Sequence, residues 1–86
     1  KRKSNFKSTA KDVLITTQLR TAMIFNKEIS AGNYTLETIN KKIYIFGIAL
    51  DDNERKLVLS ETEKIRDVEE VIPTIFTVPE LSRNKT

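Results

Sequence analysis

The 86-residue sequence contains no cysteine and no histidine, and these absences exclude most of the usual catalytic and metal chemistry. Without cysteine there are no disulfides, zinc–thiolate sites or thiol nucleophiles. Without histidine, the commonest general base and metal ligand is missing. Only two glycines occur, so a glycine-rich loop that cradles a phosphate is also excluded. We therefore expect a protein that is not an enzyme and that holds no cofactor or metal.

Long apolar runs are scarce as well. The longest, Ile43–Leu50, is far shorter than the roughly 20 residues that cross a bilayer. Adjacent acids occur at Asp51-Asp52 and Glu69-Glu70, where capping or solubility is a simpler role than acid–base catalysis. Together with Glu54 the first pair could form a small acidic cluster, but the ligand spacing of calcium loops is longer.

The positive charge is concentrated at the ends of the chain. Residues 1–11 carry five Lys or Arg and no acid, whereas residues 12–78 carry eight Lys or Arg against eleven Asp or Glu. Nucleic-acid binding requires a basic face on the domain itself, so we expect no nucleic-acid partner. We interpret residues 1–11 as a flexible basic linker or arm, residues 12–78 as the folded domain and residues 79–86 as a disordered tail.

Asp12 is suited to begin a helix as its N-cap. At 100° per residue, one face of the segment that follows is apolar and predicts packing on a sheet: Ile15, Leu19, Ala22 and Met23. Two other rows also carry large apolar residues: Val13, Thr17, Arg20 and Ile24 opposite the core row, and Leu14, Gln18, Thr21 and Phe25 beside it. The second row either widens the core row or, like Ile24, makes a separate contact.

A hairpin follows, because residues 34–39 alternate between apolar and polar and Asn40-Lys41 suits a tight turn. In the returning strand, residues 43, 45, 47 and 49 share the face assigned to the helices, and Tyr44, Phe46, Ile48 and Leu50 share the other. A second helix from Asp51 and a last strand with Pro73 complete the order. The predicted fold class is α+β, an α-β-β-α-β two-layer sandwich with two helices on one face of a three-stranded mixed sheet.

Three segments in this order, DVLITTQLR, NYTLETINKKIYIFGIA and ERKLVLSETEKIRDVEEV, resemble the BON domain (bacterial OsmY and nodulation). The resemblance is greatest to the second BON domain of tandem-BON periplasmic or outer-membrane proteins, so residues 1–11 would link it to a preceding one. Gly47 matches a glycine of that family. Lys41 or Lys42, and Asp67, stand where other members often have glycine.

The resemblance implies binding to anionic phospholipid, with a role in envelope maintenance and osmotic protection. The expected location is the periplasm, at the outer membrane, in a protein that can carry a lipoprotein anchor upstream. The lipid-facing element would be the first helix, through residues Val13, Leu14, Thr17, Arg20, Ile24, Phe25 and Lys27.

An alternative is a protein-interaction module. If helices cover only one face of the sheet, the row with Tyr44, Phe46 and Ile48 is exposed unless another surface packs on it. The partner would be a neighbouring BON domain, a second copy or another envelope protein.

Overall fold

The computed structural model describes residues 2–83 of the chain, and the side chains of residues 9–82. Its elements are α1 (Arg2–Phe25), the 3₁₀ turn η1 (Ala31–Asn33), β1 (Tyr34–Ile39), β2 (Lys42–Ala49), α2 (Asp52–Glu63), β3 (Glu70–Thr77) and α3 (Val78–Arg83). The sheet order is β1-β2-β3, with β1 antiparallel and β3 parallel to β2. The predicted α+β class and its mixed three-stranded sheet are confirmed.

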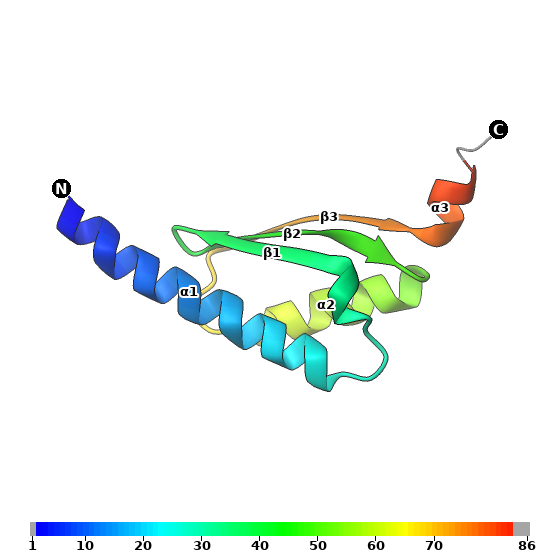
Figure 1. The fold of residues 1–86 in the computed structure, drawn as a ribbon, viewed down its shortest axis with the longest axis horizontal. Helices are drawn as coiled ribbons and strands as arrows, with labels where there is room; N and C mark the ends of the chain where they lie inside the picture. The colour runs from blue at the N-terminus through cyan, green and yellow to red at the C-terminus, as the bar shows by residue number, and fades with distance from the viewer. Residues whose placement is uncertain (1, 84–86) are drawn as a thin grey trace.

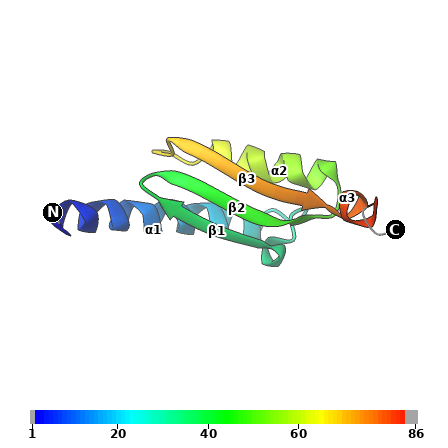
Figure 2. The ribbon, with the colours of Figure 1, turned by 90° about the horizontal axis from the view of Figure 1, so that it is seen from above.

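The helices α1 and α2 lie on the same side of the sheet, and the other side carries no helix over its width (Figures 1 and 2). The first helix packs mainly below β1, and α2 packs below β2 and β3. Parallel pairing of β2 and β3 requires a crossover, and α2 provides it. The molecule is therefore a two-layer sandwich with one open sheet face.

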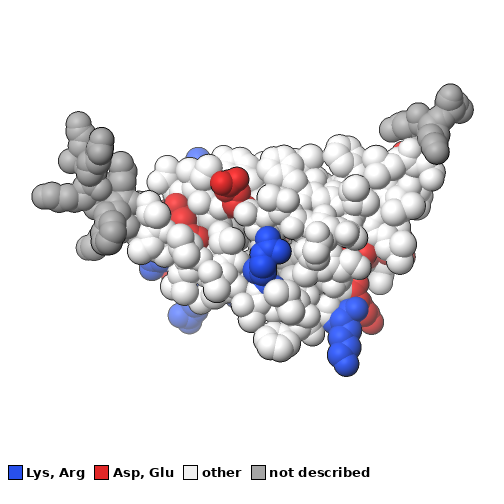
Figure 3. Space-filling model, viewed as in Figure 1, with Lys and Arg blue, Asp and Glu red and all other residues white. Residues whose placement is uncertain are grey.

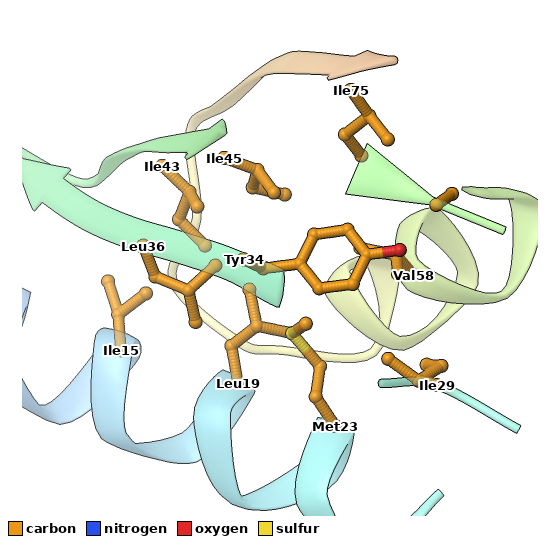
Figure 4. Close-up of a cluster of buried hydrophobic side chains, with 11 residues drawn as sticks. Ile15, Leu19, Met23, Ile29, Tyr34, Leu36, Ile43, Ile45, Val58 and Ile75 are labelled. Atoms are coloured by element: carbon orange, nitrogen blue, oxygen red, sulfur yellow. The ribbon is translucent and has the colours of Figure 1, made fainter. Parts of the chain in front are cut away.

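The core lies between the two layers (Figure 4). Ile15, Leu19 and Met23 of α1 are buried, as their spacing predicts, against inward-facing residues of the sheet and Val58 of α2. The sheet side of this core consists of Tyr34, Leu36, Ile43, Ile45, Ala49 and Ile75. Every second strand residue points inward, because successive side chains of a strand alternate between its faces.

Gly47 is required by its cross-strand neighbour. It lies opposite Tyr34 in the hairpin, and a Cβ at position 47 would stand 2.3 Å from Tyr34 Cδ1 and 2.7 Å from the Asn33 carbonyl oxygen. No side chain fits there without moving the backbone. The glycine thus lets the Tyr34 ring cross β2 and enter the core.

The helix start was predicted wrongly. The first helix begins at Arg2, not at Asp12, so the backbone of the supposed flexible arm is helical from residue 2 onward. No Pro or Gly interrupts residues 1–25, so the helix continues through Asp12. The Asp12 carboxylate instead accepts hydrogen bonds from the backbone N–H groups of Asn40 and Lys41, at 2.8 and 2.9 Å. It caps the hairpin turn rather than the helix.

The predicted disordered tail is also wrong over residues 79–83, which belong to α3, while residues 84–86 lie outside the described part. The sequence Thr77-Val78-Pro79-Glu80 forms a capping box. Glu80 Oε1 accepts from the Thr77 backbone N–H at 2.9 Å, and Thr77 Oγ1 accepts from the Glu80 N–H at 3.4 Å. The Thr77 N–H holds the pKa of the Glu80 carboxyl below its usual value.

Candidate interaction surfaces

The outer face of α1 is defined here as its exposed residues between Thr9 and Phe25. Its large members are Val13, Leu14, Ile24 and Phe25, which are 59, 51, 61 and 79% exposed. The remaining exposed positions are Thr9, Ala10, Thr17, Gln18 and Thr21. No charged residue is among them, whereas the solvent side of an amphipathic surface helix is normally charged or polar. The outer face of α1 therefore carries four large apolar side chains, and the charged Lys11, with a side chain 43% exposed, lies beside it.

Leu14 and Phe25 do not widen the core row, so that simpler interpretation of the sequence is wrong. The second helix approaches α1 from one flank only, where Asn26 Nδ2 donates to Glu61 Oε2 and Lys11 pairs with Asp67 after α2. No element covers Phe25, which is the more exposed of the two. The helix therefore keeps its outer face free over the described part of the chain.

The two cations predicted near this face lie at its border. Arg20 is partly buried and Lys27 is exposed in the loop after α1. Neither takes part in an ion pair between described residues. One helix face carries the other five residues predicted to bind lipid: Val13, Leu14, Thr17, Ile24 and Phe25. Arg20 lies within the same helix, and Lys27 follows its end.

The outer sheet face is the side of the sheet away from α1 and α2. Phe46 and Ile48 of β2 are 49 and 43% exposed, and Phe76 of β3 is 50% exposed beside Ile48. Tyr44 is half-buried next to Ile72. The predicted exposure is found for Phe46 and Ile48 but only in part for Tyr44, and Leu50 beyond this row is 67% exposed. The sequence did not predict that Ile72 and Phe76 of β3 belong to this face, because the register of a parallel strand pair cannot be derived from local sequence.

The two apolar surfaces lie on opposite sides of the sandwich, since one faces away from the sheet and the other away from the helices (Figure 1). The side view of Figure 3 shows few Lys, Arg, Asp and Glu side chains, scattered and without a patch of one sign. A flat partner can cover one of these surfaces but not both at once.

A groove of about 540 Å³ lies between α1 and β1. From the helix it is lined by Thr9, Asp12, Val13, Thr16 and Thr17, and from the strand and turn by residues 36–40. Thr16 Oγ1 and Thr38 Oγ1 lie 2.6 Å apart at its base and share a hydrogen bond. The groove was not anticipated, because it depends on how far the helix extends beside the strand.

The acidic residues near the start of α2 have structural partners. Glu54 is 5% exposed, and its carboxylate accepts from the Tyr34 hydroxyl and from the N–H groups of Ser30 and Leu50, at 2.8–3.0 Å. Asp51 caps α2 by accepting from the Glu54 N–H. Within residues 2–83 no group of three or more potential ligands is placed to hold a metal ion.

No family model matches the chain. A similar protein is an uncharacterized protein in the gshII 5′ region of Anaplasma centrale, 29% identical over 66 residues. The match covers 77% of this chain and 44% of that protein, so the chain spans less than half of its relative. In the described part of the chain, no helix is both long and apolar enough to cross a membrane.

Proposed function

We propose that this chain is a non-enzymatic, BON-like module that docks on anionic phospholipid through the outer face of α1. The observation that carries this proposal is the exposure of four large apolar residues on one face of the helix: Val13, Leu14, Ile24 and Phe25. An exposed apolar helix face with cations beside it can lie in the membrane interface, with its apolar side chains at the boundary between head groups and acyl chains. Removing Ile24 and Phe25 from water supplies the main favourable term.

The cations at the border supply a second term. Arg20 and Lys27 can reach lipid phosphates while the apolar side chains enter the interface. Each is worth about 1 kcal/mol near an anionic surface, and this contribution decreases as salt is raised. The proposed site consists of Val13, Leu14, Thr17, Arg20, Ile24, Phe25 and Lys27. Binding is therefore expected to be moderate, reversible and stronger on anionic than on neutral lipid.

The backbone geometry supports the BON-like part of the proposal. Lys41 and Asp67 stand where the family often has glycine, and both have a positive φ of 67°. Positive φ is the conformation for which glycine is preferred. The turns thus keep a glycine-type geometry although the glycines are replaced. With this assignment we place the module in the periplasm, at the outer membrane, in a protein of envelope maintenance.

Cosedimentation with vesicles tests the lipid proposal. At low salt the protein should sediment with phosphatidylglycerol-containing vesicles more than with pure phosphatidylcholine vesicles. The variants Ile24→Asp and Phe25→Asp should each lower the bound fraction at least fivefold, because a charge then replaces an exposed apolar group. A fold check by circular dichroism accompanies both variants. Thr74→Asp, on the outer sheet face, is the matched control and should bind as the original chain does. Equal failure to bind either vesicle would refute the proposal.

A second candidate function is protein docking through the outer sheet face, favoured by the neighbouring exposed side chains of Phe46, Ile48 and Phe76. Contiguous apolar surface of this kind commonly marks an interface. The partner is a preceding BON domain or another envelope protein, and Tyr44 contributes to the same surface. In a chain that includes the upstream domain, Phe46→Asp should release the contact and change the amide resonances of β2. Resonances that do not respond to the upstream domain would exclude this function.

A further inference from the structure

We propose that the groove between α1 and β1 binds an extended peptide, which pairs with β1 as a fourth strand. This site shares Val13 and Thr17 with the proposed lipid site, but the inference does not depend on the lipid or the sheet-face proposal. Sheet order leaves β1 with one free edge, and that edge faces the groove. Figure 1 looks toward this edge, with α1 below β1.

The hairpin register determines which backbone groups are free. Asn40 and Lys41, with φ of 50° and 67°, form a two-residue turn of the I′ kind, so Ile39 and Lys42 are the hydrogen-bonded pair that closes it. Pairing then alternates, and the N–H and C=O groups of Leu36 and Thr38 point away from β2. Among the described residues, no backbone group outside the hairpin forms a hydrogen bond with the N–H or C=O of Leu36 or Thr38. A peptide strand would satisfy both residues.

The opposite edge of the sheet is protected. Pro73 on β3 has no N–H to offer, and Arg55 Nη1 donates to the Ile75 carbonyl at 3.5 Å. Natural sheets commonly block an edge in these ways. The free edge of β1 has no proline, and beside it lies the open groove of about 540 Å³. The contrast between the two edges favours β1 as the edge that accepts a partner.

The size and the walls of the groove restrict what can bind in it. It is large enough for several residues, within the size range of small-ligand sites. The flank of α1 forms one wall, so an entering strand cannot carry a helix of its own below it. This argues for an isolated extended segment rather than the β1 strand of a second copy. Strand addition to an exposed edge is an established mode of peptide recognition.

Charge defines the peptide further. Asp12 and Glu37 line the groove, and among the side chains of residues 9–82 no Lys or Arg does. The Asp12 carboxylate also accepts the backbone hydrogen bonds of Asn40 and Lys41. We therefore infer an extended peptide with β-branched residues and at least one Lys or Arg, and without proline in the paired part.

The probe is a phage-displayed library of random heptapeptides, panned against the full chain. Enriched peptides should be basic and β-branched, and their affinity is then measured by fluorescence anisotropy. Thr9→Trp, which fills the groove from an exposed helix position, should weaken binding at least tenfold, and Glu37→Lys should weaken it severalfold. Thr38→Pro removes the free N–H with which the peptide would pair, so it should weaken binding as Thr9→Trp does.

The controls are Ser60→Trp and Glu63→Lys, exposed positions on α2, which should leave the affinity unchanged. Enriched peptides should also protect the Leu36 and Thr38 amides from hydrogen exchange. The proposal is overturned if no peptide is enriched. It is equally overturned if the enriched peptides bind the Thr9→Trp variant as well as the original chain, because the site would then lie elsewhere. Both outcomes leave the vesicle experiment unaffected.

Discussion

The Tyr34 hydroxyl donates a hydrogen bond of 3.0 Å to Glu54 Oε2 inside the core. This single contact joins the start of β1 to the first turn of α2. The same carboxylate accepts from Ser30 before β1 and from Leu50 after β2. Glu54 therefore connects four segments at one end of the sandwich, and it takes part in no ion pair among the described residues. A buried carboxylate is tolerable here because backbone and phenol donors replace its water.

Replacing Tyr34 by Phe should destabilise the fold. The substitution keeps the ring in the core but leaves Glu54 with one donor fewer, and a lost hydrogen bond to a buried charged group costs about 1.5–3 kcal/mol. Chemical unfolding should show a lower midpoint with an unchanged slope. The control is Tyr44→Phe, on the outer sheet face and only half-buried, which should shift the free energy of unfolding by less than about 0.5 kcal/mol. Equal shifts for the two variants would contradict a special role of the Tyr34–Glu54 contact.

The same contact predicts a dependence of stability on pH. Burial, and then the hydrogen bond and charge of Glu54, raise the pKa of Tyr34 in the folded protein. The unfolded phenol ionises near pH ~10, so below that value both states keep the proton and this group adds no slope. Above it only the unfolded state releases the proton, and stability falls by up to ~1.4 kcal/mol per pH unit.

Urea titrations between pH 8 and 11.5 measure this effect. The free energy of unfolding of the original chain minus that of Tyr34→Phe should be constant up to pH 9.5 and then decrease. Taking the difference removes the contribution of the lysines, which both chains share. A difference that stays flat to pH 11.5 would show that the pKa of Tyr34 is not raised.

Asp12 should contribute to stability through the hairpin rather than through the helix. Its two oxygens accept from Asn40 and Lys41 N–H groups, so Asp12→Ala removes both acceptors and should cost about 1–3 kcal/mol. Asp12→Asn keeps one acceptor oxygen and should cost less. Glu63→Ala, an exposed acid on α2, is the control and should stay within about 0.5 kcal/mol. Hydrogen exchange of the Asn40 and Lys41 amides should accelerate in Asp12→Ala; unchanged exchange would refute the cap.

The sequence was informative where the pattern is local. Alternation predicted the hairpin, its turn and the inward row of β2, and helical spacing predicted Ile15, Leu19 and Met23 as core. Asp12 was predicted to cap the first helix, but it caps the hairpin turn. Aspartate is a common helix N-cap. Here, however, its carboxylate accepts from Asn40 and Lys41, which are 28 and 29 positions further along the chain. Such a contact is invisible in a local pattern.

The start of α3 and the exposure of the α1 flank differ in how far the sequence predicts them. The capping box at Thr77 and Glu80 is a local signal in the sequence that predicts the start of α3. The exposure of Leu14 and Phe25 could not be predicted, because a helical wheel does not tell which flank α2 approaches. For the same reason the groove beside β1 follows only from the assembled layers. The candidate surfaces thus depend on packing more than on motifs.

The two glycines provide a matched test of the packing around Tyr34. A Cβ at Gly47 would overlap the Tyr34 ring and the Asn33 carbonyl, so Gly47→Ala should destabilise the fold by about 1–3 kcal/mol, as overpacking does. At Gly32 no atom lies within 4 Å of the added Cβ and φ is not positive. Gly32→Ala should therefore be neutral or stabilise by up to ~1 kcal/mol, through the reduced entropy of the unfolded chain. Thermal unfolding separates the two outcomes, since ~1 kcal/mol moves the midpoint by about 4–8 °C in a domain of this size. If Gly47→Ala were as stable as Gly32→Ala, the Tyr34 ring could not lie across β2 as described, and the Glu54 contact would lose its geometric basis.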